Sequence, residues 1–236
     1  MQLEIGKSYF DVRPLNVLND LPSIKITPDH FLIPDTPLVN AMIRFAVIGH
    51  KAVTTPDFSL NDMPGGAGRM DVLCRCINAS FFLSHDLRRN TECFLILKGG
   101  EQADPEQTIT LKFSGDKIKS LNPDERSAGA LIKKALVTIP EEEYQRAAPG
   151  ISIRKSGLAK LLEEHEFAVL DENGEDIRMA EILPENFILS DHQNFTEEEM
   201  ELIKDLPKYS VGLRVLHADH TITIILNEFD RRGEQA

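Results

Sequence analysis

The sequence predicts an α/β fold in which helices pack on a central sheet, and three observations support this. Strand patterns alternate with amphipathic helix patterns from residue 42 onward, which is typical of a layered α/β architecture. The apolar runs at 43–49 and 94–97 suit strands that are buried in a sheet. The chain of 236 residues, with 42% hydrophobic and 27% charged residues, has the size and composition of one large globular domain.

The first 41 residues differ from the rest of the chain. They contain five prolines and show no sustained hydrophobic period. We predict that residues 1–41 form a loosely packed or disordered N-terminal extension, and that residues 42–236 form a single domain. Met42 stands immediately before the first strand pattern and is therefore a candidate for the true translation start.

The order of elements within residues 42–236 follows from hydrophobic period and from helix capping signals. In the first half we expect a strand at 43–49, a helix from a glycine segment to about residue 82, strands at 94–97 and 108–113, and a helix at 123–136. In the second half we expect a helix at 156–164, strands at 167–170 and 187–190, a helix after a capping box at Thr196 and Glu199, a strand at 209–212 and a helix at 221–232.

The net charge limits which partners the protein can bind. A formal charge of −12 argues against general affinity for nucleic acid. The charge is unevenly distributed: residues 42–136 carry 13 Lys and Arg against 11 Asp and Glu, whereas residues 137–236 carry 10 against 22. Any nucleic-acid surface should therefore be a local patch within residues 42–136.

The compartment follows from what the sequence lacks. It contains no run of about 18 apolar residues that could span a membrane, and its start lacks the basic and apolar parts of a secretory signal. Its three cysteines, two of them in Cys74-Arg75-Cys76, form neither a disulfide framework nor a paired zinc motif. We predict a cytoplasmic protein with reduced, partly buried thiols, no membrane span and no metal.

The segment Gly65-Gly66-Ala67-Gly68 opens a helix and suits close approach to a ligand. Free amides and the dipole at a helix start favour an anion. Asp71 and Arg75 lie four residues apart and should pair, whereas Arg69 and Arg75 lie six apart and should diverge. The pair of Asp71 and Arg75 is either a surface ion pair, or it keeps the carboxylate of Asp71 ionised so that this group can accept a proton. The dinucleotide and P-loop patterns are absent, which argues against a nucleotide-binding enzyme.

A second candidate site lies at 189–192, where a strand ends in Leu189-Ser190-Asp191-His192. Ligand sites of open α/β sheets lie at such strand ends. His192 is either a catalytic base or a hydrogen-bonding loop residue. The nearby histidines and aspartates, including His217 and His220, have no spacing that demands a metal. Gly212, at the end of the next strand, permits a sharp turn or close contact with a ligand.

Six strings, taken in order over about residues 42–232, resemble the archaeal-type tRNA pseudouridine N1-methyltransferase family of the SPOUT superfamily. They are VIGHKA at 47–52, PGGAGRMDVLCR at 64–75, FLSHDLRR at 82–89, LNPDER at 121–126, LSDH at 189–192 and NEFDRR at 227–232.

The resemblance implies a SPOUT-type α/β fold, with a central mostly parallel sheet flanked by helices and a C-terminal trefoil knot. It implies a homodimer that transfers a methyl group from S-adenosylmethionine to N1 of pseudouridine 54 in the T-loop of tRNA. Its cofactor loops correspond to Leu189, Ser190, Asp191, His192, Gly212, Leu213, Leu216 and Thr221.

For this reaction we predict that Asp71 accepts the N1 proton, and that Arg69 or Arg75 binds a phosphate or a base carbonyl. Arg69, Arg75, Arg88 and Arg89 are the predicted RNA contacts. The family usually has Gly-Pro at Gly212-Leu213 and Cys at Thr221. These departures leave open two alternatives, a diverged member acting on another RNA and a non-catalytic RNA-binding protein.

Overall fold

The computed structural model describes residues 42–100 and 103–233, so the predicted extension 1–41 lies outside the described residues. The strands are β1 (Ile43–Gly49), β2 (Thr91–Leu97), β3 (Ile109–Ser114), β4 (Gln145–Ala148), β5 (Ile151–Lys155), β6 (Ala168–Asp176), β7 (Asn186–Ser190) and β8 (Lys208–Ser210). The α-helices are α1 (Met70–Phe81), α2 (Glu125–Ala135), α3 (Leu158–Glu164), α4 (Glu197–Ile203) and α5 (Ala218–Arg232).

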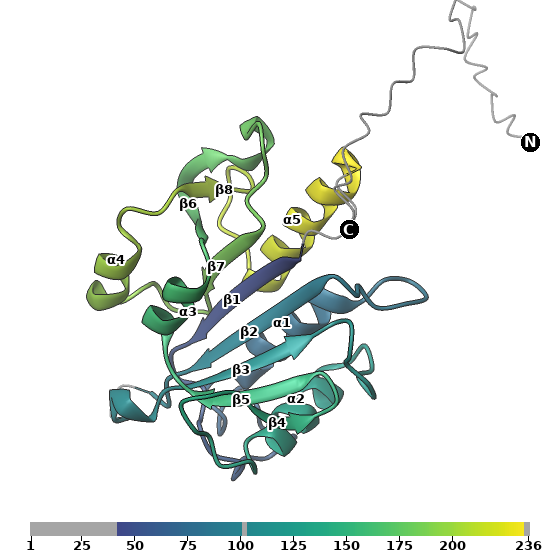
Figure 1. Ribbon diagram of the computed structural model, residues 1–236, viewed down its shortest axis with the longest axis vertical. Helices are drawn as coiled ribbons and strands as arrows, with labels where there is room; N and C mark the ends of the chain where they lie inside the picture. The colour runs from purple at the N-terminus through teal and green to yellow at the C-terminus, as the bar shows by residue number, and fades with distance from the viewer. Residues whose placement is uncertain (1–41, 101–102, 234–236) are drawn as a thin grey trace, which may run out of the picture. The chain divides into compact units, whose positions relative to one another are not determined.

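All eight of these strands form one sheet in the order β4-β5-β3-β2-β1-β7-β6-β8 (Figure 1). β1 lies inside the sheet and pairs in parallel with β2 and with β7. β6 and β8 continue the parallel part, whereas β3, β5 and β4 add an antiparallel part at the other side. The predicted α/β fold with a mostly parallel sheet is confirmed, and the trefoil knot stays a prediction.

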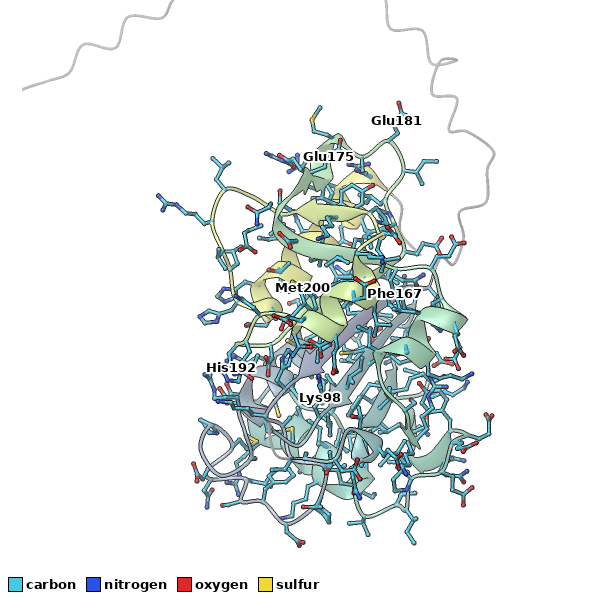
Figure 2. All side chains as sticks on the ribbon, turned by 90° about the vertical axis from the view of Figure 1, so that its left-hand side faces the viewer. Lys98, Phe167, Glu175, Glu181, His192 and Met200 are labelled. Atoms are coloured by element: carbon cyan, nitrogen blue, oxygen red, sulfur yellow. The ribbon has the colours of Figure 1, made fainter. Side chains whose placement is uncertain are left out.

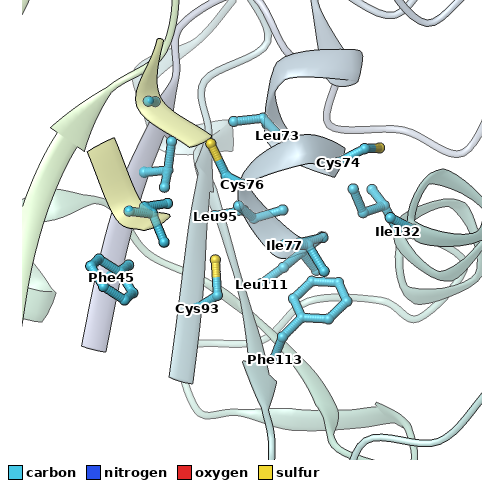
Figure 3. Close-up of a cluster of buried hydrophobic side chains, with 14 of the residues drawn as sticks. Phe45, Leu73, Cys74, Cys76, Ile77, Cys93, Leu95, Leu111, Phe113 and Ile132 are labelled. Atoms are coloured by element: carbon cyan, nitrogen blue, oxygen red, sulfur yellow. The ribbon is translucent and has the colours of Figure 1, made fainter. Parts of the chain in front are cut away.

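The central strands are buried on both faces, which explains why their sequences are apolar without alternation. On β1, Phe45 and Val47 point into a larger core, whereas Ala46 and Ile48 point into a smaller one. Helices α1, α2 and α5 supply the larger core, and α3 and α4 supply the smaller one. Figure 3 shows the larger core, where Ile77 of α1 lies among residues of the sheet and of α2.

The three cysteines lie in this larger core and are buried completely, whereas the sequence predicted only partly buried thiols. Cys74, Cys76 and Cys93 are free and fully buried. Burial raises the pKa of Cys74 and of Cys93 to about 12, since a thiolate is poorly solvated in an apolar core. These thiols therefore stay protonated at neutral pH and act as packing groups.

Two parts of the sheet differ from the prediction. The hairpin of β4 and β5 was not predicted, because its strands are short and only β5 contributes a clear apolar face. Gly150 in its turn has a φ of 73°, a conformation that glycine adopts at little cost. β6 does not end at the predicted turn: it resumes after a register shift in which Leu170 and Glu175 both lie opposite Tyr209.

The helix boundaries agree more closely with the sequence. The capping box at Thr196 and Glu199 is present at the start of α4. Asp124 caps α2 by accepting a hydrogen bond from the amide of Ser127. The last helix, α5, begins at Ala218, one turn before the predicted start at Thr221, since the amide of Thr221 already donates to the carbonyl of the N-cap residue His217.

The glycine segment before α1 is packed against its own chain. Gly68 has a φ of 62°, and a Cβ atom there would lie 1.7 Å from the carbonyl oxygen of Lys51. The amides of Gly65 and Gly66 bind the carboxylate of Asp62. These glycines therefore close a tight turn, and the amides of Gly65 and Gly66, which the sequence suggested for an external anion, are already bound to Asp62.

We expect Gly68→Ala to lower the free energy of unfolding by at least about 2 kcal/mol, because alanine is strained at this φ and its Cβ collides with backbone. The matched control is Gly212→Ala, since a Cβ atom on Gly212 would meet no atom within 4 Å and its φ is not positive. Urea unfolding of both variants measures the difference, and equal midpoints would contradict the steric account.

Candidate active site

The candidate site lies at the edge of the sheet where β1, β2 and β7 end. In parallel sheets these carboxyl ends meet at one edge, and ligands bind in the crevice beyond it. His50, Lys98 and Asp191 directly follow the three strands, and α1 begins at the same edge through the contact of Gly68 with Lys51. The polar residues that follow the strands are therefore brought together by the sheet itself.

Asp71 is the centre of one polar cluster at this edge and is only 4% exposed. Its Oδ1 accepts a hydrogen bond from Nε of Arg69 at 3.0 Å, and its Oδ2 accepts one from Nη2 of Arg69 at 3.2 Å. Oδ2 also accepts a hydrogen bond from Nη1 of Arg75 at 3.0 Å. The predicted pairing of Asp71 with Arg75 is confirmed, and Oδ1 keeps one lone pair for a further donor.

Arg69 and Arg75 converge on Asp71, although their spacing in a helix predicts that they diverge. Arg69 is the N-cap of α1 and has a left-handed backbone with a φ of 65°, so its side chain does not follow the helical spacing. Its guanidinium group lies beside the first turn of the helix and donates hydrogen bonds to both carboxylate oxygens of Asp71 from two of its nitrogens. Sequence spacing could not reveal this, because it assumes that both residues are helical.

The charge of Asp71 is set by two opposing effects. Burial disfavours the carboxylate, but the hydrogen bonds from Arg69 and Arg75 outweigh burial and hold the pKa of Asp71 below its usual value. Asp71 is therefore ionised at neutral pH. It can orient both guanidinium groups and can accept a hydrogen bond from a ligand at Oδ1.

Arg75 connects this cluster to α2 and α5. Its Nη1 donates to Oε1 of Glu125 at 3.1 Å, and its Nε lies 3.9 Å from Oδ1 of Asp219. Asp219 stands in the first turn of α5, and its Oδ1 is buried without a hydrogen-bond donor among residues 42–100 and 103–233. An unsatisfied buried carboxylate oxygen is costly, so Asp219 marks a position where a donor from a ligand would be stabilising.

A cavity of about 290 Å³ lies between the middle of β6, the end of β7 and the start of α5, where Ala218 lines it beside Asp219 in the sequence. Five of the residues predicted to bind the cofactor line it, namely Leu189, Ser190, Asp191, Leu216 and Thr221. The other lining residues, which the sequence did not single out, are Leu170, Asp171, Glu172, Gln193, Asn194, Phe195, Met200, Ile203, Lys208, Val215 and Ala218. They come from β6, from the segment between β7 and α4, from α4 and β8, and from the start of α5 with the segment that leads into it. Sequence spacing could not group them, because these elements meet only in the folded sheet.

The remaining predicted cofactor residues, Gly212, Leu213 and His192, do not line this cavity. Gly212 lines a smaller adjacent cavity of about 70 Å³, which shares Leu216 and Thr221 with the larger one. His192 contacts Asp191 at 3.2 Å but lines neither cavity. Leu213 is fully exposed. Thr221, which stands where the family usually has Cys, donates its hydroxyl to the carbonyl of His217. Its hydroxyl therefore has a hydrogen-bond partner at the start of α5.

Arg88 and Arg89 lie away from the site, beyond the far end of α1 and next to the start of β2. Arg88 is bound to Asp230 of α5 through both ends of its guanidinium group, with Nη1 2.8 Å from Oδ1. Arg89 is half exposed and binds Asp86 and the carbonyl of Gly115. The structure therefore brings Arg69 and Arg75 together but does not bring Arg88 and Arg89 to them.

Two broader properties apply to the described part of the chain. No group of three His, Cys, Asp or Glu side chains within residues 42–100 and 103–233 is arranged to hold a metal ion. No helix in these ranges is long and apolar enough to cross a membrane.

Comparison with known proteins agrees with this fold. Residues 42–234 match the family model described as "Putative SAM-dependent RNA methyltransferase". The chain is similar in structure to Archaeoglobus fulgidus Nep1 bound to S-adenosylhomocysteine, with a TM-score of 0.56 and 14% identity over 81% of this chain and 98% of that one. The matching family, whose model covers residues 42–234, defines the chain as a SAM-dependent RNA methyltransferase.

The relatives found by sequence comparison identify a narrower family. The chain is 93% identical over 195 residues to the tRNA (pseudouridine(54)-N(1))-methyltransferase of Methanocorpusculum labreanum, covering 83% of this chain and 100% of the relative. It is 53% identical to the enzyme of the same name from Methanocella arvoryzae, over 81% of this chain and 100% of the relative. The chain belongs to the tRNA (pseudouridine(54)-N(1))-methyltransferase family.

Proposed function

We propose that this protein transfers the methyl group of S-adenosylmethionine to N1 of pseudouridine 54 in the T-loop of tRNA. The observation that carries the proposal is the position of the Asp71 cluster one side chain away from the cavity. Arg75 spans from Asp71 to Asp219, and Asp219 adjoins Ala218, which lines the cavity. A base held at Asp71 and a cofactor held in the cavity would therefore meet at the start of α5.

The residues of the cavity fit S-adenosylmethionine in size and chemistry. Its volume of about 290 Å³ is at the small end of ligand pockets, and the adjoining cavity extends it. Leu189, Phe195 and Leu216 offer apolar walls to an adenine ring, while Ser190 offers a hydroxyl to polar groups. The cavity also contains more carboxylates than cations, which suits a cationic ligand. We propose that Leu189, Ser190, Asp191, His192, Gly212, Leu213, Leu216 and Thr221 form the cofactor loops.

When bound, S-adenosylmethionine supplies a methyl group that leaves its sulfur as a cation equivalent, so that the sulfur retains the bonding electrons. The chain must remove the proton from N1 and align this nitrogen. We propose that Oδ1 of Asp71 accepts the proton, directly or through water. Arg69 and Arg75, which Asp71 holds in place, stabilise the negative charge that develops on the ring.

The same proposal includes a homodimer that works in the cytoplasm. Apolar side chains lie exposed beside the cavity: Leu213 is fully exposed and Val215 is 75% exposed. Exposed apolar groups at the rim of a polar site are typical of a surface that a partner covers. A second copy seated there would shield Leu213 from water and complete the cofactor loops.

The test of the proposed function has two parts. Calorimetric titration of the purified protein with S-adenosylhomocysteine should show saturable binding at one site per chain. Methyl transfer from labelled S-adenosylmethionine should then occur on tRNA carrying pseudouridine 54 and not on the same tRNA with uridine 54. Binding without transfer to either tRNA would favour a diverged enzyme for another RNA, and no binding by folded protein would favour a non-catalytic RNA-binding protein.

We expect Asp71→Asn to lower kcat at least about a hundredfold, the usual loss for a missing general base, because an amide accepts no proton at neutral pH. Binding of S-adenosylhomocysteine should be unchanged, since Asp71 does not line the cavity. Asp219→Asn is the matched comparison, with a smaller expected loss. A larger loss in Asp219→Asn than in Asp71→Asn would transfer the role of proton acceptor to Asp219.

Arg88 and Arg89 are proposed to contact tRNA phosphates. Their different surroundings predict different effects of replacing each with alanine. Arg89→Ala should weaken tRNA binding and reduce the slope of log K against log salt by about 0.7 to 0.9, the value for one phosphate contact. Arg88→Ala should mainly lower stability, because it leaves Asp230 unpaired. Filter binding over a range of salt concentrations measures the tRNA affinity of both variants. Unchanged affinity in the double variant would show that both residues have only a structural role.

A further inference from the structure

Four ionisable side chains form a second buried cluster at the same edge, which we call the His50 network. His50 and Lys98 directly follow β1 and β2, Asp191 directly follows β7, and Glu199 is the third residue of α4. Figure 2 shows Lys98 close to α4, the helix that carries Met200. The network thus ties three strands of the sheet to a helix that walls the cavity.

One imidazole ring lies between two carboxylates in this network. Nδ1 of His50 is 3.0 Å from Oδ1 of Asp191, and Nε2 is 2.9 Å from Oε2 of Glu199. A carboxylate only accepts hydrogen bonds, so both ring nitrogens must donate, and a ring with two donors is the imidazolium. Lys98 donates to the other oxygen of Glu199 at 2.6 Å. Two cations therefore balance two carboxylates.

The burial of the cluster makes this balance important. His50, Asp191 and Glu199 are each less than 10% exposed in their side chains, and a buried charge without its partner is strongly destabilising. Burial alone would lower the pKa of His50, but the hydrogen bonds to Asp191 and Glu199 raise it to about 9. Burial would raise the pKa of Glu199, but His50 and Lys98 lower it to about 2.

The two carboxylates fix both ends of the segment that joins β7 to α4. Asp191 accepts hydrogen bonds from the backbone amides of His50 and Gln193. Glu199 accepts one from the amide of Thr196, in the capping box of α4. Between these two anchors lie Gln193, Asn194 and Phe195, which line the cavity. The ring of His50 is thus the common partner of both anchors of one cavity wall.

We propose that His50 is a positioning residue for the cofactor, and that its imidazolium ring, which donates one N–H to Asp191 and the other to Glu199, holds the 191–199 wall in the form that binds the cofactor tightly. The proposal rests on the proposed function, since it assumes that the cavity binds S-adenosylmethionine. His50 does not line the cavity, so it acts through Asp191 and Glu199.

The pH dependence follows from the groups that face the network. Asp191, which also contacts His192, has a pKa below its usual value, as does Glu199, so both carboxylates stay ionised above pH 7. The pKa of His50 is raised on folding, so its contribution to stability is complete below about pH 6.5, declines above that, and is lost as the pH passes about 9. Cofactor affinity should therefore be constant near neutral pH and fall above pH 9.

Calorimetric titration with S-adenosylhomocysteine from pH 7 to pH 10 tests this proposal. We expect the Kd of the unmodified protein to rise about tenfold above pH 9, within the usual range of coupling between two sites. His50→Gln, which cannot carry a charge, should bind about tenfold more weakly at pH 7.5 and show no such rise. The amino group of the ligand titrates in the same range, but it does so equally in both proteins and cancels in the comparison.

Glu199→Gln gives a readout that a merely structural role would not move. Removing one carboxylate lowers the pKa of His50, because one of the two anions that stabilise its charged ring is lost. The midpoint of the rise in Kd should therefore shift to lower pH. His85→Gln is the matched control, because His85 is exposed and lies beyond the far end of α1. Circular dichroism at each pH shows that every variant is folded.

Identical pH profiles in the unmodified protein and in His50→Gln would overturn the proposal, as would an unchanged midpoint in Glu199→Gln. Either result would leave the proposed function intact, since binding at pH 7.5 would still have been seen. Absence of binding by the folded, unmodified protein at pH 7.5 would overturn both the proposed function and the role of His50.

Discussion

The structure depends on the burial of β1 on both faces between its parallel neighbours β2 and β7. The middle residues of a strand in this position have no side chain free to face water, so Phe45, Ala46, Val47 and Ile48 are all apolar and fully buried. Polar chemistry is confined to the residues beyond the strand end, because parallel strands all end at one edge. The position of the site therefore follows from burial of the sheet in the hydrophobic core.

The edge where β1, β2 and β7 end carries several charged side chains that are largely buried from water, and these side chains form ion pairs. Arg69 and Arg75 hold Asp71, and His50 and Lys98 hold Asp191 and Glu199. Such pairs add little net stability compared with an apolar core, but breaking one is costly. They therefore fix the geometry of the edge, since each charge is stable in only one arrangement with its partners.

The sequence was sufficient for features that are local or that follow from burial. The strand at 43–49, the capping box at Thr196 and the pair of Asp71 with Arg75 depend on neighbouring residues, and all are present. The approach of Arg69 to Asp71 was not predictable, because it needs a left-handed backbone at a non-glycine residue. The His50 network was missed for another reason: its members lie up to 149 residues apart and meet only once strand order is known.

The charge balance at Asp71 also decides what the arginines can do for a nucleic acid. Arg69 and Arg75 carry two positive charges, but they contact or approach three carboxylates, those of Asp71, Glu125 and Asp219. A phosphate brought to this cluster would meet a net negative surrounding and would have to compete with carboxylates already bound. A neutral base would meet no such repulsion and could donate to Oδ1 of Asp71. The charge of this cluster therefore suits a neutral ring that donates a hydrogen bond better than it suits a phosphate.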